Sequence, residues 1–129
     1  MAGSVIIRIM GKKLNYLFVC LANENRSPTA EAVCRRIAEE NNLEIKVSSA
    51  GVSKGANNPL TKDMADAADR IFIMEREMIV TLRNEFGQNP GKIVCLSIPD
   101  RYPRDDPWLI KILEDKLYEY FEEEGLLAK

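Results

Sequence analysis

Short apolar runs alternate along the chain with longer segments whose apolar residues follow a helical spacing. The first run, over residues 15–20, is apolar, aromatic and β-branched, which is typical of a strand buried inside a parallel sheet. The next segment has apolar residues three and four positions apart, at Ala30, Val33, Cys34, Ile37 and Ala38. This spacing predicts an amphipathic helix, with Ser27 as its N-cap, Pro28 in its first position and Asn41 at its end.

The same alternation continues to the C-terminus. Further strands are predicted at 43–49, 70–74 and 92–96, and further helices at 60–68, at 75–86 and from Pro107 onward. Strands that alternate with helices at this spacing form right-handed βαβ units. We therefore expect an α/β fold with three layers, in which a four-stranded parallel sheet carries helices on both faces. Ligands of such sheets bind outside the carboxyl ends of the strands.

The chain has 129 residues, enough for one core and too few for two domains. Residues 14–129 are expected to form that single domain. Residues 1–13 precede the first predicted strand, and three interpretations of them stay open: an added strand, a disordered arm, or a segment upstream of a true start at Met10.

Charge and cysteine usage narrow the class of protein. The formal net charge of −2 gives no overall electrostatic attraction to nucleic acid or to an anionic membrane. The apolar segment 4–10 contains Arg8 and is too short to span a bilayer. Three cysteines without a Cys-x-x-Cys pair argue against a disulfide framework or a zinc site. These observations predict a reduced, cytoplasmic protein.

Histidine is absent from the sequence, which removes the commonest general base and the commonest metal ligand. Ser-His-Asp, Cys-His and His-zinc sites are therefore excluded. The groups left for acid–base chemistry near neutral pH are carboxylates, thiols, tyrosines and lysines whose pKa is shifted. No metal and no cofactor is expected.

The segment after the first strand, CLANENRS over residues 20–27, has the features of a phosphate-binding loop. A tight loop between a strand and a helix aims successive backbone N–H groups inward, and the helix N-terminus adds its dipole. Arg26 can bind two phosphate oxygens at once. Cys20 would face the same donors, which favour its thiolate. The predicted phosphate-binding residues are Leu21, Ala22, Asn23, Glu24, Asn25, Arg26 and Ser27.

The Cys-x5-Arg spacing alone has little weight, because the segment 95–101 also matches it. That second segment contains Pro99 and no helix is predicted to start after it. The copy at Cys20 is distinguished by the strand before it and the Ser27-Pro28 helix start after it. We interpret Cys34 and Cys95, which lie on apolar faces, as core thiols.

Residues 17–31, LFVCLANENRSPTAE, resemble the signature of the low-molecular-weight protein tyrosine phosphatases in their short form. Segments 48–51 and 68–75 are similar to the ends of that family's second and third strands, and 98–100 is similar to its general-acid loop. The resemblance implies a metal-free, two-step reaction in which Cys20 is the nucleophile and becomes phosphorylated. It also implies that Arg26 holds the phosphoryl oxygens, Ser27 stabilises the thiolate and Asn23 braces the loop.

The resemblance leaves the general acid open. Asp100 has the expected distance from the strand and the Ile-Pro lead-in, but Arg101 follows it. Asp106 has the literal Asp-Pro step, yet it is also the natural N-cap of the last helix. We favour Asp100, with Asp106 and then Asp105 as alternatives.

The expected partner is a phosphotyrosine protein or a small aryl phosphate, bound by a monomer. Tyr102 is a candidate substrate contact, and Glu24 should repel acidic peptides at the rim. Two alternative functions stay open. One is an arsenate reductase of the same fold, which would need two further cysteines to reach Cys20. The other is a phosphoprotein-binding module without turnover.

Overall fold

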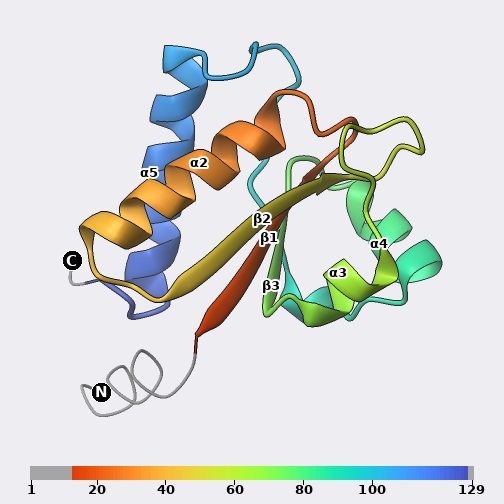
Figure 1. Cartoon of the computed structure of the whole chain (residues 1–129), viewed down its shortest axis with the longest axis horizontal. Helices are drawn as coiled ribbons and strands as arrows, with labels where there is room; N and C mark the ends of the chain where they lie inside the picture. Colours follow the sequence, from red (N-terminus) through yellow and green to blue (C-terminus); the bar gives the residue numbers. More distant parts are fainter. Residues whose placement is uncertain (1–12, 128–129) are drawn as a thin grey trace.

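The fold was analysed in a computed structural model, which describes residues 13–127. Its elements in chain order are β1 (Leu14–Cys20), α2 (Arg26–Glu40), β2 (Ile45–Gly51), α3 (Lys62–Ala67), β3 (Arg70–Ile73), α4 (Met78–Phe86), a 3-10 turn (Pro90–Lys92), β4 (Ile93–Cys95) and α5 (Pro107–Glu123). Figure 1 shows how they are arranged. The prediction for residues 1–13 falls almost wholly outside the described residues.

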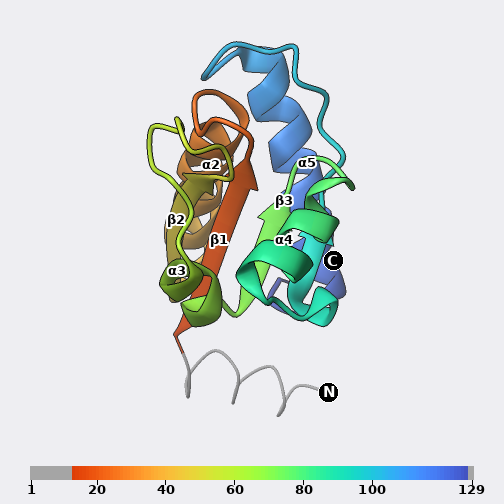
Figure 2. The same ribbon diagram turned by 90° about the vertical axis from the view of Figure 1, so that its right-hand side faces the viewer.

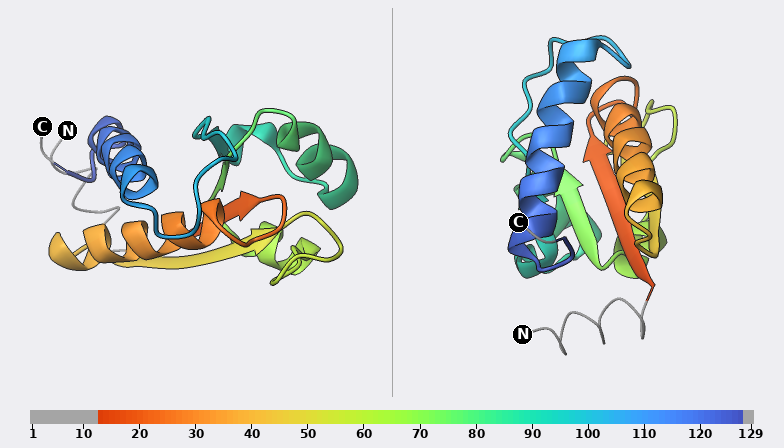
Figure 3. Two further views of the ribbon diagram at one scale, coloured as in Figure 1. Left: turned by 90° about the horizontal axis from the view of Figure 1, so that it is seen from above. Right: turned by 90° about the vertical axis from the view of Figure 1, so that its left-hand side faces the viewer.

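The four strands form one parallel sheet in the order β2-β1-β3-β4. Helices α2 and α5 cover one face of this sheet, and α3 and α4 cover the other (Figures 2 and 3). The predicted α/β fold is thereby confirmed. Cys20 is the last residue of β1, an inner strand, so it lies at the carboxyl edge of the sheet, where the loops after β1, β2 and β4 gather.

The core explains why β1 has no polar face. All residues from Tyr16 to Cys20 are buried, because helices press on both sides of the strand. The Phe18 and Phe72 rings stack on neighbouring strands with centroids 4.7 Å apart. The α5 side chains that complete this core are Leu109, Leu113, Leu117 and Phe121.

Several element boundaries differ from those predicted by local sequence rules. Helix α2 begins at Arg26, so Ser27 is not its N-cap, and the Asn25 side chain makes no capping bond either. The helix predicted from residue 75 begins only at Met78. The second strand runs over Ile45–Gly51 rather than 43–49, because Asn42 turns the chain with a φ of 55°. Within residues 13–127, no helix has the length and hydrophobicity that a bilayer crossing requires.

Candidate active site

A small pocket opens where β1 ends. Its volume is about 60 Å³, and seven residues line it: Cys20, Leu21, Ala22, Glu24, Asn25, Arg26 and Asp100. A cavity of this size holds one small group, such as a phosphoryl group, and leaves the rest of a substrate outside. The structure therefore brings the predicted nucleophile, most of the predicted loop and the favoured acid to one place.

The outer side of the loop is tied to the segment after β2. The carbonyl of Cys20 accepts a bond from Val52 N (3.0 Å), that of Leu21 from Ser53 N (2.9 Å) and that of Ala22 from Asn57 N (3.0 Å). The Asn57 side chain donates to the carbonyl of Asn23 at 3.2 Å. Because four successive carbonyls are paired on the outside, the loop amides are available to an anion on the inside.

Asn23 and Ser27 lie behind the pocket rather than in its lining, and both are buried. The Asn23 side-chain amide donates to Ser27 Oγ at 2.9 Å and to Ser49 Oγ at 3.0 Å. Ser27 Oγ lies 2.9 Å from Cys20 Sγ, so its hydroxyl hydrogen can point at the sulfur. Asn23 has a φ of 54°, a left-handed conformation that its side-chain bonds hold in place.

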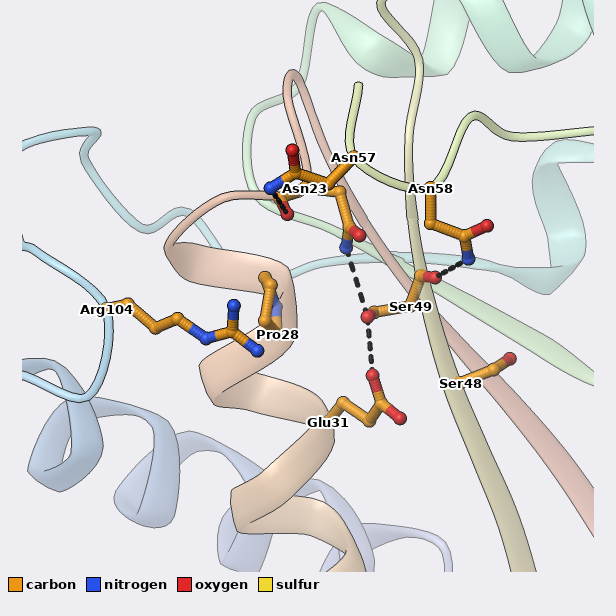
Figure 4. A pocket seen from close by; sticks show the side chains of 8 residues that line it. All are labelled: Asn23, Pro28, Glu31, Ser48, Ser49, Asn57, Asn58 and Arg104. Atoms are coloured by element: carbon orange, nitrogen blue, oxygen red, sulfur yellow. Dashed lines mark hydrogen bonds between the residues drawn. The ribbon is translucent and has the colours of Figure 1, made fainter. Parts of the chain in front are cut away.

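Ser49 extends this network away from the sulfur, since it donates to the Glu31 carboxylate. Figure 4 shows the chain of bonds from Asn23 through Ser49 to Glu31. These residues line a second hollow of about 280 Å³ behind the loop, toward which Arg104 extends from the segment before α5. Sequence reasoning noted Ser49 as the end of a strand and missed its part in bracing Asn23.

Arg26 is 2% exposed and has three partners. Nη1 donates to the carbonyl of Ile98 at 2.8 Å, Nη2 donates to Glu75 Oε1 at 3.2 Å, and Nε lies 3.6 Å from Asp100 Oδ1. Glu75 was expected to begin a helix, and its link to Arg26 was missed. The available signal was its place directly after a buried strand, at the edge of the sheet where ligands bind.

The candidate acids separate clearly in space. Asp100 lines the pocket and is exposed. The Asp106 carboxylate accepts bonds from Trp108 N and Leu109 N, so it is the N-cap of α5. Asp105 is in a left-handed conformation with a φ of 61°. Tyr102 is not among the residues that line the pocket; its ring lies 5.6 Å from the Arg101 guanidinium.

The other two cysteines have different surroundings. Cys34 lies on the buried side of α2, and burial raises the pKa of its thiol to about 12. Cys95 lies in β4, with its sulfur 3.5 Å from Ser97 Oγ. Both are free thiols. Within residues 13–127, no three His, Cys, Asp or Glu side chains gather closely enough to hold a metal ion.

Comparison with known proteins agrees with this geometry. The family model "Low molecular weight phosphotyrosine protein phosphatase" matches residues 15–65, which include the pocket loop and β2. Over these residues the chain is similar to this family. The predicted resemblance is thus confirmed over residues 15–65, and the chain shares its fold with several solved phosphatase structures.

Among relatives, a protein-arginine-phosphatase of Bacillus subtilis (strain 168) is 29% identical over 105 residues, 64% of this chain and 70% of that protein. A YwlE mutant structure from Bacillus subtilis has a TM-score of 0.71 at 24% identity, covering 87% of this chain and 99% of that one. The tyrosine phosphatase Wzb from Escherichia coli K30, in complex with phosphate, has a TM-score of 0.72 at 22% identity, covering 87% and 99%. The arsenate reductase alternative is not favoured by these relatives.

Proposed function

We propose that this phosphatase hydrolyses phosphoryl groups in two steps through a phosphocysteine. In the first step the Cys20 thiolate attacks phosphorus, the bond to the leaving oxygen breaks, and Asp100 donates its proton to that oxygen. In the second step Asp100 takes a proton from water, whose oxygen attacks phosphorus. The S–P bond then breaks, which releases inorganic phosphate and restores the thiolate.

The observation that carries this proposal is the single pocket lined by Cys20, the loop residues, Arg26 and Asp100. Its donors are held before any substrate arrives, because the loop carbonyls are bonded outward and Arg26 is fixed by Ile98 and Glu75. Groups that need no reorganisation stabilise a developing charge most effectively. A structure related to this fold, a YwlE arginine phosphatase mutant, carries a phosphorylated serine in its active site.

The proposed substrate is a phosphotyrosine protein or a small aryl phosphate. The pocket accommodates the phosphoryl group, so the phenyl ring would lie at its mouth, where Leu21 is 53% exposed. An aliphatic side chain at that position gives the ring apolar surface to pack on. Tyr102 remains a predicted contact for the part of the substrate beyond the ring.

A second candidate substrate is phosphoarginine in proteins. Glu24 lines the same pocket as Asp100, and two carboxylates at one mouth attract a guanidinium group more than a neutral phenol. A relative of this chain is a protein-arginine-phosphatase. Comparing kcat/KM for a phosphotyrosine peptide and a phosphoarginine peptide, in wild type and Glu24→Gln, decides between the two. A selective loss on phosphoarginine in E24Q would support the second substrate.

We further propose that the protein works as a monomer in the cytoplasm, without nucleic acid or membrane as a partner. The three free thiols support a reducing compartment, and the net charge of −2 provides no overall attraction to nucleic acid or to an anionic membrane. Gel filtration at micromolar concentration tests the oligomeric state.

Aryl phosphate hydrolysis in the presence of a chelator tests the reaction itself. We expect wild type to turn over fully under chelation and Cys20→Ser to be inactive while still binding vanadate. If wild type and C20S were equally inactive yet both bound vanadate, the chain would be a phosphate-binding module instead. Cys34→Ala is the matched control, because that buried thiol has no part in the proposed reaction.

A further inference from the structure

The loop of residues 97–106 carries Asp100 and is anchored at two points, one before that residue and one after it. Before Asp100, Ile98 donates its amide to the carbonyl of Met74 at 2.9 Å and accepts Arg26 Nη1 at 2.8 Å. After Asp100, the amide of Asp105 donates to Thr29 Oγ1 at 3.0 Å. The exposed Asp100 side chain therefore sits in a short span whose ends are both fixed.

Thr29 is 1% exposed, in the first turn of α2, and its hydroxyl has two partners. It accepts from Asp105 and donates to the carbonyl of Asn25 at 2.8 Å. Asn25 belongs to the phosphate-binding loop and lines the pocket. One hydroxyl thus connects the loop that holds the phosphoryl group to the loop that carries Asp100.

The conformation of Asp105 makes this bond important. A φ of 61° is a left-handed conformation, which costs a residue other than glycine about 1–3 kcal/mol and persists only where the surroundings fix it. The bond from its amide to the buried Thr29 hydroxyl is such a constraint. Without it, the segment between Ile98 and Asp106 would keep only its anchor at Ile98, through Arg26.

Arg26 and Thr29 lie three residues apart, on one face of α2. Both contact the 97–106 loop, Arg26 at its beginning and Thr29 near its end. The helix turn that closes the phosphate-binding loop therefore holds both ends of the segment containing Asp100. A shift at either anchor would move the carboxylate relative to Cys20.

We propose that Thr29 is a positioning residue, whose hydroxyl sets the place of Asp100 relative to the phosphoryl group. This inference rests on the role of Asp100 proposed above. Thr29 itself touches no reacting atom; it acts through Asp105 on one side and Asn25 on the other. Its loss should therefore impair proton donation to the leaving group more than phosphoryl binding.

The test compares kcat/KM for two substrates, phenyl phosphate and para-nitrophenyl phosphate. Phenolate is the poorer leaving group and depends more on general-acid help, which is worth about 10²–10⁴ in rate. Thr29→Val keeps the shape of the side chain and removes the hydroxyl, whereas Thr29→Ser keeps the hydroxyl. We expect T29V to lose on the order of tenfold more kcat/KM on phenyl phosphate than on para-nitrophenyl phosphate, as a fraction of that contribution.

The ratio of the two kcat/KM values does not depend on the fraction of protein that is folded, so instability alone cannot produce the effect. T29S should keep the wild-type ratio. Thr61→Val is the matched control, because Thr61 also bonds a backbone amide, that of Met64, but at the cap of α3. T61V should lower the melting temperature and leave the ratio unchanged.

Asp100→Asn separates failure of this inference from failure of the proposed function. In the D100N background, adding T29V should change the ratio no further, since the acid is already lost. If D100N changes the ratio and T29V alone does not, the role of Thr29 is overturned and that of Asp100 stands. If D100N keeps full activity on both substrates, the role of Asp100 is overturned and that of Thr29 with it.

Discussion

Replacing Gly51 with alanine should distort the phosphate-binding loop from behind. Gly51 ends β2 and pairs with Cys20 at the end of β1. A Cβ at this position would lie 2.6 Å from the Ala56 side chain, 2.8 Å from the carbonyl oxygen of Leu21 and 2.9 Å from the carbonyl carbon of Ala22. Two of these three atoms are backbone atoms of the loop, which cannot rotate away as a side chain could.

The size of the effect follows from these distances. Ordinary van der Waals contact begins near 3.4 Å, so the neighbours would have to retreat by roughly 0.5–0.8 Å. Overpacking of this kind typically costs about 1–3 kcal/mol of folding free energy. For a domain of this length that corresponds to a fall in melting temperature of roughly 3–15 °C. A displacement approaching 1 Å in a positioning group can cost up to about a hundredfold in rate.

The assay measures the melting temperature, kcat/KM for an aryl phosphate and inhibition by inorganic phosphate in the same preparations. We expect Gly51→Ala to lower the first two and to weaken phosphate inhibition, because the loop amides no longer converge. Gly55→Ala is the matched control, since a Cβ there meets no atom within 4 Å. A G51A protein with wild-type melting temperature and wild-type kcat/KM would refute the reasoning.

Three further predictions concern single side chains. Asp100→Ala should lower kcat/KM for phenyl phosphate by about a hundredfold or more. Asp106→Ala should keep turnover and lose about 1 kcal/mol of folding stability, because α5 loses its N-cap. The reverse pattern would exchange the proposed roles of the two residues. Glu75→Ala should raise KM more than it lowers kcat, because Arg26 loses an anchoring carboxylate; an unchanged KM would contradict that link. Burial raises the pKa of Cys34 from 9.0 to about 12, so the protonated thiol stabilises the fold below pH 9 and this contribution is lost as pH rises toward 12. The free energy of unfolding in urea, measured from pH 7 to 11, should therefore decline with pH. Cys34→Ala should make that decline less steep, and an equal decline in the variant would contradict the assignment.

The order of helices and strands could be predicted from the sequence because burial decides it. A strand covered on both faces must be apolar throughout, as 15–20 is, and α2 must present one apolar stripe to the sheet. The position of Cys20 at a carboxyl edge follows from the same alternation. Sequence spacing favours Asp100 over Asp106 as the general acid, and this choice stays a prediction; of the two, Asp100 is the one that lines the pocket.

Contacts between distant segments could not be predicted. Ser27 has the local features of an N-cap, but its hydroxyl lies against Cys20 Sγ, which a local rule does not consider. Glu75 looks like a helix residue until the sheet register brings it to Arg26, 49 positions away. Thr29 and Asp105 are 76 positions apart, so nothing in either neighbourhood indicates their bond.

Strand β1 and the 97–106 loop, which both contribute to the candidate active site, should open to solvent at different rates, because β1 lies inside the sheet. Its residues Tyr16 to Val19 pair with strands on both sides, so their amides should exchange with solvent only when the whole domain unfolds. The 97–106 loop is anchored by a few single bonds and can open without that cost. During such an opening Cys20, the proposed nucleophile, would stay in place, while Asp100, the proposed proton donor, is briefly displaced. Amide exchange should therefore resolve β1 and the 97–106 loop as separate cooperative units.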